Sequence, residues 1–137
     1  MASGCVFCAI IAGDVPATMV MRDDDVAAFL DARPLFKGHV LVVPRAHTPT
    51  LYDVPPAALG PLFAGVQRIA RAVEAGLGVD GTFVAMNNKV SQSVPHLHVH
   101  VVPRKRKDGL RGFFWPREPY ADDAEREAFA AKIRAAL

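Results

Sequence analysis

Residues 95–104 read PHLHVHVVPR and place a histidine at every second position. In a β-strand, side chains at i, i+2 and i+4 share one face and stand roughly 6.6 Å apart. In a helix, the same spacing would rotate successive side chains by about 200° and separate them. The alternation therefore predicts a strand over residues 97–102, with His96, His98 and His100 on one face and aliphatic side chains packed against a helix on the other.

Patterns on both sides of this stretch indicate a domain that mixes strands with helices. Short apolar runs bounded by turn residues predict three more strands, at residues 26–31, 40–43 and 82–86. Apolar residues recur every three or four positions over residues 55–76, which predicts one long helix. Residues 122–137 begin with acidic side chains and are expected to form a C-terminal helix.

Length and composition limit the class of protein. The chain has 137 residues, of which 51% are hydrophobic and 22% charged, and we interpret it as a single domain over residues 1–137. No apolar run approaches the roughly 18 residues of a membrane span and no signal-peptide pattern is visible, so we expect a cytoplasmic protein without membrane contact. The net charge of only +2 argues against a stable complex with nucleic acid.

Three imidazoles in register can supply a nucleophile, an acid or base, or metal ligands, whereas a solvated face that happens to be rich in imidazole would need no function. A catalytic zinc held by three histidines and covalent catalysis by one histidine both remain open at this point. Residues 87–93, NNKVSQS, supply amide and hydroxyl donors suited to phosphate oxygens. Because few acidic residues lie nearby to hold a cation, we favour phosphate chemistry on histidine without a required divalent metal.

Residues 92–102, QSVPHLHVHVV, resemble the signature of the histidine triad family of nucleotide hydrolases and transferases, in which three histidines alternate with apolar residues. The opening CVFC at residues 5–8 is similar to the N-terminus of that family. FLDARP at residues 29–34 and GHVLVVPRAH at residues 38–47 match its first hairpin. The resemblance covers roughly residues 3–104 and leaves residues 105–137 as a C-terminal extension.

The resemblance implies an α+β fold: an antiparallel sheet of about five strands, one long central helix and a C-terminal helix, in a chain that pairs into a homodimer. It also implies that His98 attacks the α-phosphorus of a purine nucleotide, either a nucleoside phosphoramidate or a dinucleoside polyphosphate. A nucleotidyl-histidine intermediate would form, and water would then release the nucleoside monophosphate.

The resemblance assigns roles to further positions. His100 is expected to hydrogen-bond the phosphate or the leaving atom, and Asp31 matches an acid that binds ribose hydroxyls. A backbone carbonyl is expected to hold the far nitrogen of His98 and so fix its tautomer. The implied catalytic residues are Gln92, Ser93, His96, His98 and His100, and the implied substrate-binding residues are Asp31, Asn87, Ser91, Gln92, Ser93, His98 and His100.

Cys5 and Cys8 have the C-x-x-C spacing of a redox pair, a disulfide or half of a zinc site, and two inert thiols are the simplest alternative. No other cysteine is present, so any further metal ligands must be histidines, with His47 and His96 as the candidates. This set resembles the structural Cys2His2 zinc site of some histidine triad proteins. We therefore expect a structural zinc ion and no catalytic metal.

Several features remain open at the level of sequence. The resemblance does not choose among leaving groups or between hydrolase and phosphorylase branches, and a non-catalytic, zinc-stabilised nucleotide sensor is the alternative to an enzyme. Met19, Met21 and Val26 either line a base pocket or belong to the core. His39 is interpreted as a structural hydrogen-bonding partner behind the histidine row, with catalysis as its alternative. The aromatic cluster at residues 113–115 either packs the tail or covers a site.

Overall fold

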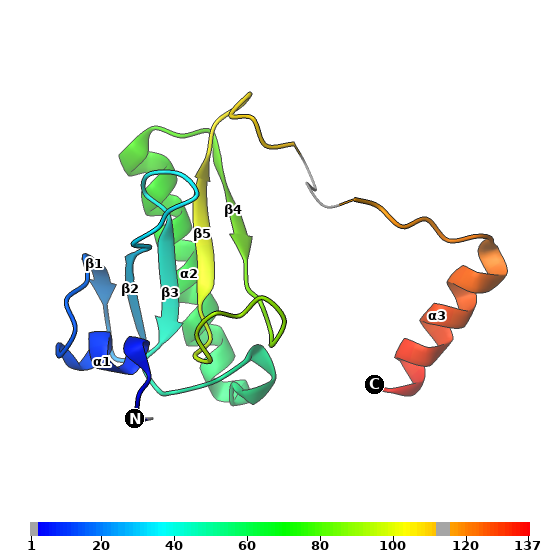
Figure 1. Ribbon diagram of the computed structural model, residues 1–137, viewed down its shortest axis with the longest axis horizontal. Helices are drawn as coiled ribbons and strands as arrows, with labels where there is room; N and C mark the ends of the chain where they lie inside the picture. Colours follow the sequence, from blue (N-terminus) through cyan, green and yellow to red (C-terminus); the bar gives the residue numbers. More distant parts are fainter. Residues whose placement is uncertain (1–2, 112–115) are drawn as a thin grey trace.

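The computed structural model describes residues 3–111 and 116–137, so the aromatic cluster at residues 113–115 lies outside the described part of the chain. Figure 1 shows the arrangement of the elements. In chain order they are α1 (Val6–Ala12), β1 (Met19–Arg22), β2 (Val26–Leu30), β3 (Val40–Pro44), a 3-10 turn (Leu51–Asp53), α2 (Pro56–Leu77), β4 (Gly81–Ala85), β5 (Val99–Arg104) and α3 (Asp123–Ala135).

The five described strands form one antiparallel sheet in the order β1-β2-β3-β5-β4. This architecture confirms the predicted α+β fold with about five strands. The predicted hairpin is also confirmed, because β2 pairs with β3 from Val26 opposite Pro44 to Leu30 opposite Val40. Within the sheet, β5 lies between β3 and β4 and places His100 opposite both Leu41 and Ala85.

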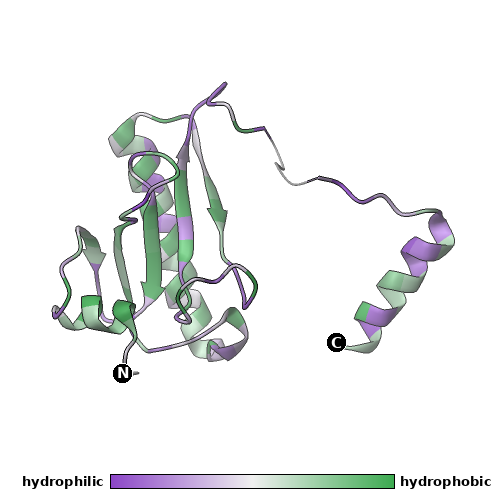
Figure 2. Ribbon diagram, in the orientation of Figure 1, coloured by the Kyte–Doolittle hydropathy of each residue, from purple (hydrophilic) through white to green (hydrophobic). Residues whose placement is uncertain are grey.

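Both faces of the central strands are buried, which explains why these strands are apolar along nearly their whole length (Figure 2). On one face, α2 lies across the sheet (Figure 1) and packs its buried residues Leu62, Val66, Ile69 and Val73 against the strands. The predicted contact of Leu97, Val99 and Val101 with a helix is confirmed by their place in this cluster. The opposite face is covered by α1, and the residues of that second cluster are Phe7, Ile10, Ile11, Ala27, Phe29, Leu41 and Val43.

The structure departs from the sequence-based expectation at three short elements. α1 and β1 were not expected, since seven and four residues are too few to display a clear hydrophobic period. α1 is defined instead by its ends: the Cys5 sulfur accepts a hydrogen bond from the Cys8 amide, and Gly13 adopts a left-handed conformation. β5 begins at Val99 rather than at residue 97, so His96 and His98 lie in the segment that leads into the strand.

α3 confirms the predicted C-terminal helix and its acidic cap. The Asp122 side chain accepts a hydrogen bond from the Glu125 amide at the first turn. No residue of α3 is buried, and the helix stands clear of the sheet (Figure 1). In the described part of the chain, no helix combines the length and the apolar character needed to cross a membrane.

The close packing of α2 against the sheet requires a residue without a side chain at position 65, which is Gly65. A Cβ at this position would lie 2.8 Å from Cγ2 of Val26, a fully buried residue of β2. We expect Gly65→Ala to lower the free energy of unfolding by about 1–3 kcal/mol, because a stiff β-branched side chain in a packed core cannot move aside cheaply. Urea unfolding measures this loss.

Gly76 of the same helix provides the matched control. A Cβ there would meet no atom within 4 Å, and the residue is exposed. Gly76→Ala is expected to raise the free energy of unfolding by up to about 1 kcal/mol through helix propensity alone. Equal effects of the two substitutions would contradict the close approach of α2 to β2.

Candidate functional site

A cavity of about 850 Å³ opens beside α1, at the end of the sheet where β2 and β3 are joined. Polar residues from three separate segments of the sequence meet at this cavity. Asp31, Ser93, His98 and His100 all line it. The remaining wall is largely apolar and includes Val6, Phe7, Ile10, Phe29 and Leu41. Such a cavity, apolar with a few convergent polar groups, is typical of small-molecule binding sites.

His98 is held in a single orientation at this cavity. Its Nδ1 lies 2.7 Å from the carbonyl oxygen of His96, and the side chain is only 5% exposed. A carbonyl oxygen can only accept, so in the neutral imidazole of His98 the proton is on Nδ1 and Nε2 carries the lone pair. The ring of Phe7 packs edge-on at 5.1 Å between centroids. The geometry therefore provides an imidazole whose unprotonated nitrogen is Nε2.

His100 follows on β5 and lies with its ring 5.1 Å from that of His98. Its Nδ1 is 2.9 Å from Nε2 of His39, a buried residue just before β3. Burial lowers the pKa of His100 to about 4, and the neighbouring histidines His98 and His39 contribute in the same direction. His100 is therefore neutral at pH 7 in the protein without ligand.

This lowered pKa predicts how stability depends on pH. Between about pH 6.5 and pH 4, the unfolded chain binds a proton at His100 that the folded protein does not bind. The free energy of unfolding therefore falls as the pH decreases through this window, by on the order of 1–3 kcal/mol from this group. Urea unfolding at pH 7 and pH 4.5 measures the fall. His100→Gln is expected to show a smaller fall in the free energy of unfolding than the wild type. An identical fall would contradict the lowered pKa of His100.

Residues 87–93 form a compact loop whose polar side chains bond both within the loop and to residues 49–51. Gln92 donates from Nε2 to the Pro49 carbonyl oxygen at 2.6 Å, and its Oε1 accepts from the Lys89 amide at 2.9 Å. Asn87 donates to the Ser91 carbonyl oxygen at 3.3 Å. Of the four expected phosphate-binding positions in this segment, Ser93 lines the cavity, whereas Asn87, Ser91 and Gln92 shape the loop that presents it.

Asp31 lies at the end of β2, where the chain turns towards His39. Its Oδ1 accepts a hydrogen bond from the Arg33 amide at 2.9 Å, and Oδ2 lies 3.7 Å from Nδ1 of His39. The carboxylate thus borders both the cavity and the pair formed by His39 and His100.

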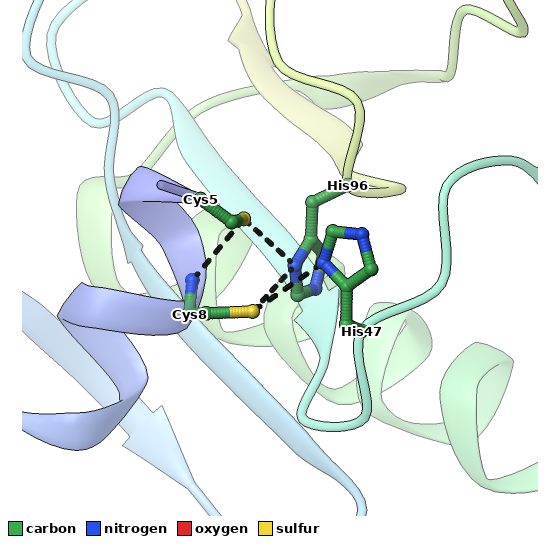
Figure 3. Close-up of side chains that lie close together, drawn as sticks. All are labelled: Cys5, Cys8, His47 and His96. Atoms are coloured by element: carbon green, nitrogen blue, oxygen red, sulfur yellow. Dashed lines mark hydrogen bonds between the residues drawn. The ribbon is translucent and has the colours of Figure 1, made fainter. Parts of the chain in front are cut away.

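A second cluster lies behind the cavity, where Cys5, Cys8, His47 and His96 converge from three parts of the chain (Figure 3). One donor atom from each residue lies within 4.8 Å of all the others. Cys5 is the N-cap of α1, Cys8 belongs to its first turn, His47 follows β3 and His96 precedes β5. The structure therefore brings together all four metal ligands expected from the sequence.

The separations of these donors match those of a tetrahedral zinc site. Nδ1 of His96 lies 3.5 Å from the Cys5 sulfur and 3.6 Å from the Cys8 sulfur, and Nδ1 of His47 lies 3.4 Å from the Cys8 sulfur. Zinc bonds of about 2.3 Å to sulfur and 2.0 Å to nitrogen place such ligands about 3.5 Å apart. His96 donates from Nε2 to the Pro44 carbonyl oxygen at 2.8 Å, which leaves Nδ1 free to bind a metal.

The apolar wall of the cavity was missed by sequence reasoning. It is built mainly from α1 and from the cavity-facing side of β2 and β3, with Phe7 and Phe29 in edge-to-face contact at 5.4 Å. The candidates Met19, Met21 and Val26 do not line it. Val26 is fully buried in the core and Met21 packs against that core, which favours the core interpretation for both. The C-x-x-C spacing identifies Cys5 and Cys8 as candidate ligands, but it indicates neither the helix α1 nor which way the apolar side chains of α1 point.

Comparison with known proteins gives a consistent picture. The HIT domain matches residues 12–107 of this chain. An uncharacterized HIT-like protein of Mycobacterium tuberculosis is 44% identical over 138 residues, which cover 97% of this chain and 92% of the relative. The crystal structure of a HIT family member from Bacillus subtilis superposes with a TM-score of 0.88 at 34% identity, over 98% of each chain. A zinc-bound histidine triad family protein from Mycobacterium smegmatis has a TM-score of 0.75 and 40% identity, also over 98% of each chain.

Some relatives carry the names of activities. An adenylylsulfatase of Arabidopsis thaliana is 37% identical over 108 residues, which cover 77% of this chain and 55% of that protein. An adenosine 5′-monophosphoramidase of Schizosaccharomyces pombe is 29% identical over 135 residues, covering 95% of this chain and 98% of the relative. An asymmetrical bis(5′-nucleosyl)-tetraphosphatase of the same yeast is 37% identical over 84 residues, covering 60% of this chain and 46% of the relative.

Proposed function

The chain belongs to the HIT domain family, and on that premise we propose that it is a nucleotide hydrolase that works through a covalent nucleotidyl intermediate on His98. The observation that carries the proposal is the hydrogen bond of 2.7 Å between Nδ1 of His98 and the His96 carbonyl oxygen. This bond leaves Nε2 unprotonated at a cavity shared with Ser93 and His100. A binding site alone would not need an imidazole prepared as a nucleophile.

In the first step, a bond forms between Nε2 of His98 and the α-phosphorus while the bond from phosphorus to the leaving atom breaks. The leaving atom keeps the electron pair and takes up one proton from solvent, and an N–H of His100 stabilises it by a hydrogen bond. In the second step, water attacks the phosphorus and the bonding pair returns to Nε2 of His98. The water's spare proton goes to solvent, and a nucleoside monophosphate is released.

The other cavity residues are proposed to bind and orient the nucleotide. The apolar wall around Phe7 and Phe29 suits a purine base, and the Asp31 carboxylate suits the ribose hydroxyls. Ser93 would contact the phosphate directly. Asn87, Ser91 and Gln92 would act by holding the shape of the phosphate loop, since their side chains or carbonyls are engaged within it or with Pro49.

We further propose that Cys5, Cys8, His47 and His96 hold a structural zinc ion, a role supported by the donor separations and by the zinc-bound Mycobacterium smegmatis relative. A zinc ion with four protein ligands has no open position for substrate, so it would contribute to folding rather than to chemistry. The ion would fix α1 against the segments that carry His47 and His96, and so support the wall of the cavity.

The proposal also includes a cytoplasmic homodimer. β4 is an edge strand of the sheet, and Val84 on it is 41% exposed, which favours pairing with a second copy.

The alternative to an enzyme is a zinc-stabilised nucleotide sensor that keeps the pocket without turnover.

Release of adenosine monophosphate in magnesium-free buffer tests the function. Adenosine phosphoramidate and diadenosine tetraphosphate serve as the two substrates, because they differ only beyond the α-phosphate. Turnover of either compound supports the hydrolase, and the faster one identifies the class of leaving group. Binding of both compounds by folded protein without turnover would support the sensor instead.

A further inference from the structure

A second cavity, of about 410 Å³, lies between the loop that joins β2 to β3 and the segment that follows β5. Phe36 and Lys37 of the loop line it, and so do residues 105–107, Lys-Arg-Lys, of the other segment. The loop and β5 meet at the same end of the sheet (Figure 1), where a Cβ on Gly38 would lie 3.5 Å from Cγ of Pro103. None of the residues that line this second cavity lines the cavity of the histidine row.

Part of the second cavity is apolar. Phe36, Val79 and Pro103 line it from the β2–β3 loop, the end of α2 and β5. Phe36 and Val79 are half-buried, and Pro103 is buried. A hollow of several hundred Å³ that combines apolar surface with a few polar groups has the size and character of a small-molecule site.

The polar part of the lining is strongly basic. Its cationic residues are Lys37, Lys105, Arg106 and Lys107. Among the described residues, none of these four side chains has a partner in a salt bridge or a hydrogen bond. A hollow lined by charges of one sign concentrates ligands of the opposite sign, so this cavity favours anions.

Two acidic residues bond to the basic segment, and neither neutralises its side chains. Asp108 also lines the cavity, but its carboxylate accepts two hydrogen bonds from the guanidinium of Arg104, which holds the pKa of Asp108 at about 2. Asp80 accepts a hydrogen bond from the backbone amide of Arg106 at 2.8 Å. The negative charge of Asp108 is therefore paired with a cation that does not line the cavity, and the lining keeps its positive charge.

The basic segment is a fixed turn rather than a loose tail. Asp108 accepts a hydrogen bond from the Lys105 amide at 3.2 Å, and Arg104 donates to the Leu110 carbonyl oxygen at 3.0 Å. Lys107 has a φ of 63°, a left-handed conformation that glycine or asparagine adopts more easily. A lysine at such a position costs stability, and this cost is understandable if the charge of Lys107 serves a ligand.

We propose that this cavity is a second ligand site, separate from the catalytic cavity, and that it binds a small phosphorylated molecule carrying an apolar ring. The phosphate would lie between Lys37 and the cations of residues 105–107, held by charge-assisted hydrogen bonds. The ring would pack on the three apolar side chains of the lining. Binding at this site does not require turnover by the proposed hydrolase. The alternative is a solvated basic loop that attracts any anion weakly and without preference.

An NMR titration of the wild-type protein with p-nitrophenyl phosphate tests the site, and inorganic phosphate serves as the probe that lacks a ring. We expect saturable shifts of the backbone amides of residues 36–37 and 104–108. The aryl phosphate should bind at least about 10-fold more tightly than inorganic phosphate, because only its ring buries apolar surface. Shifts confined to residues 91–100 would place the probe in the catalytic cavity alone and overturn the proposal. Equal affinities for the two probes would also overturn it.

Substitutions on opposite walls test the role of the charges. Lys37→Glu and Lys107→Asn are each expected to weaken binding of p-nitrophenyl phosphate by about 10-fold or more at low ionic strength. Asparagine tolerates the left-handed conformation at position 107, so this variant should fold. Unchanged binding by both folded variants, as judged by thermal unfolding, would overturn the proposal.

Lys132→Glu on α3 is the matched control for Lys37→Glu. It makes the same change of net charge at an exposed lysine that does not line the cavity, and it should weaken binding by less than about 2-fold. Equal weakening by Lys37→Glu and Lys132→Glu would indicate general attraction of anions and overturn the proposal. A short single-stranded RNA that shifts the same amides and binds more tightly than the aryl phosphate would overturn it in favour of a nucleic-acid surface.

Discussion

His98→Ala is expected to lower kcat by on the order of 10⁴-fold or more on whichever nucleotide the wild type hydrolyses. The substitution removes the only side chain proposed to form a bond to phosphorus, and a water molecule attacking in its place would lack the fixed position of Nε2. Folding should survive, because His98 is at the cavity wall and its main hydrogen bond is to a backbone carbonyl. The rate of monophosphate release measures the loss.

His100→Ala is the matched control in the same cavity. It removes a hydrogen-bond donor and not the nucleophile, so we expect a smaller loss of kcat, of about 10²- to 10³-fold.

Rapid acid quenching of the wild type should trap one nucleotidyl group on the peptide that contains His98. An adduct on another residue, or substantial turnover by His98→Ala, would disprove the covalent role of His98.

The fold could be predicted largely because its strands and its long helix carry strong local patterns. The period of α2 and the apolar runs of β2 and β3 are visible in the sequence, and all three elements lie within about two residues of their expected bounds. The start of the strand that carries the alternating histidines was predicted two residues too early. Leu97 donates its N–H to the Thr48 carbonyl oxygen rather than to a neighbouring strand, so β5 begins only at Val99.

The sequence predicted which residues form the site, but not the distances and orientations of their side chains. Cys5, Cys8, His47 and His96 were selected by residue type, and tertiary folding alone gives their separations of about 3.5 Å. The apolar wall could not be predicted, because it depends on which face of a seven-residue helix turns to the sheet. The hydrogen bond between His39 and His100 depends on the register of β3 against β5, which no local pattern encodes.

Cys8→Ser is expected to lower the free energy of unfolding by on the order of 3 kcal/mol or more in protein purified with zinc. Cys8 is 2% exposed and lies within hydrogen-bonding distance of both histidines of the cluster. A serine hydroxyl does not ionise at neutral pH, so it replaces a strong zinc ligand with a poor one. Urea unfolding before and after chelation measures the effect. The wild type should fall to the stability of the variant when chelated, whereas the variant should respond little.

Ile11→Val controls for packing in the same helix. Ile11 is buried against the sheet but belongs to the second core cluster and not to the ligand set, so its loss of about 1 kcal/mol should be the same with and without chelator. The time course of turnover separates structural from catalytic zinc. If the ion only fixes α1, activity after addition of chelator should decline gradually, at the same rate as the N-terminal region unfolds. Immediate loss of turnover while the fold remains intact would instead favour a metal ion that acts on the substrate.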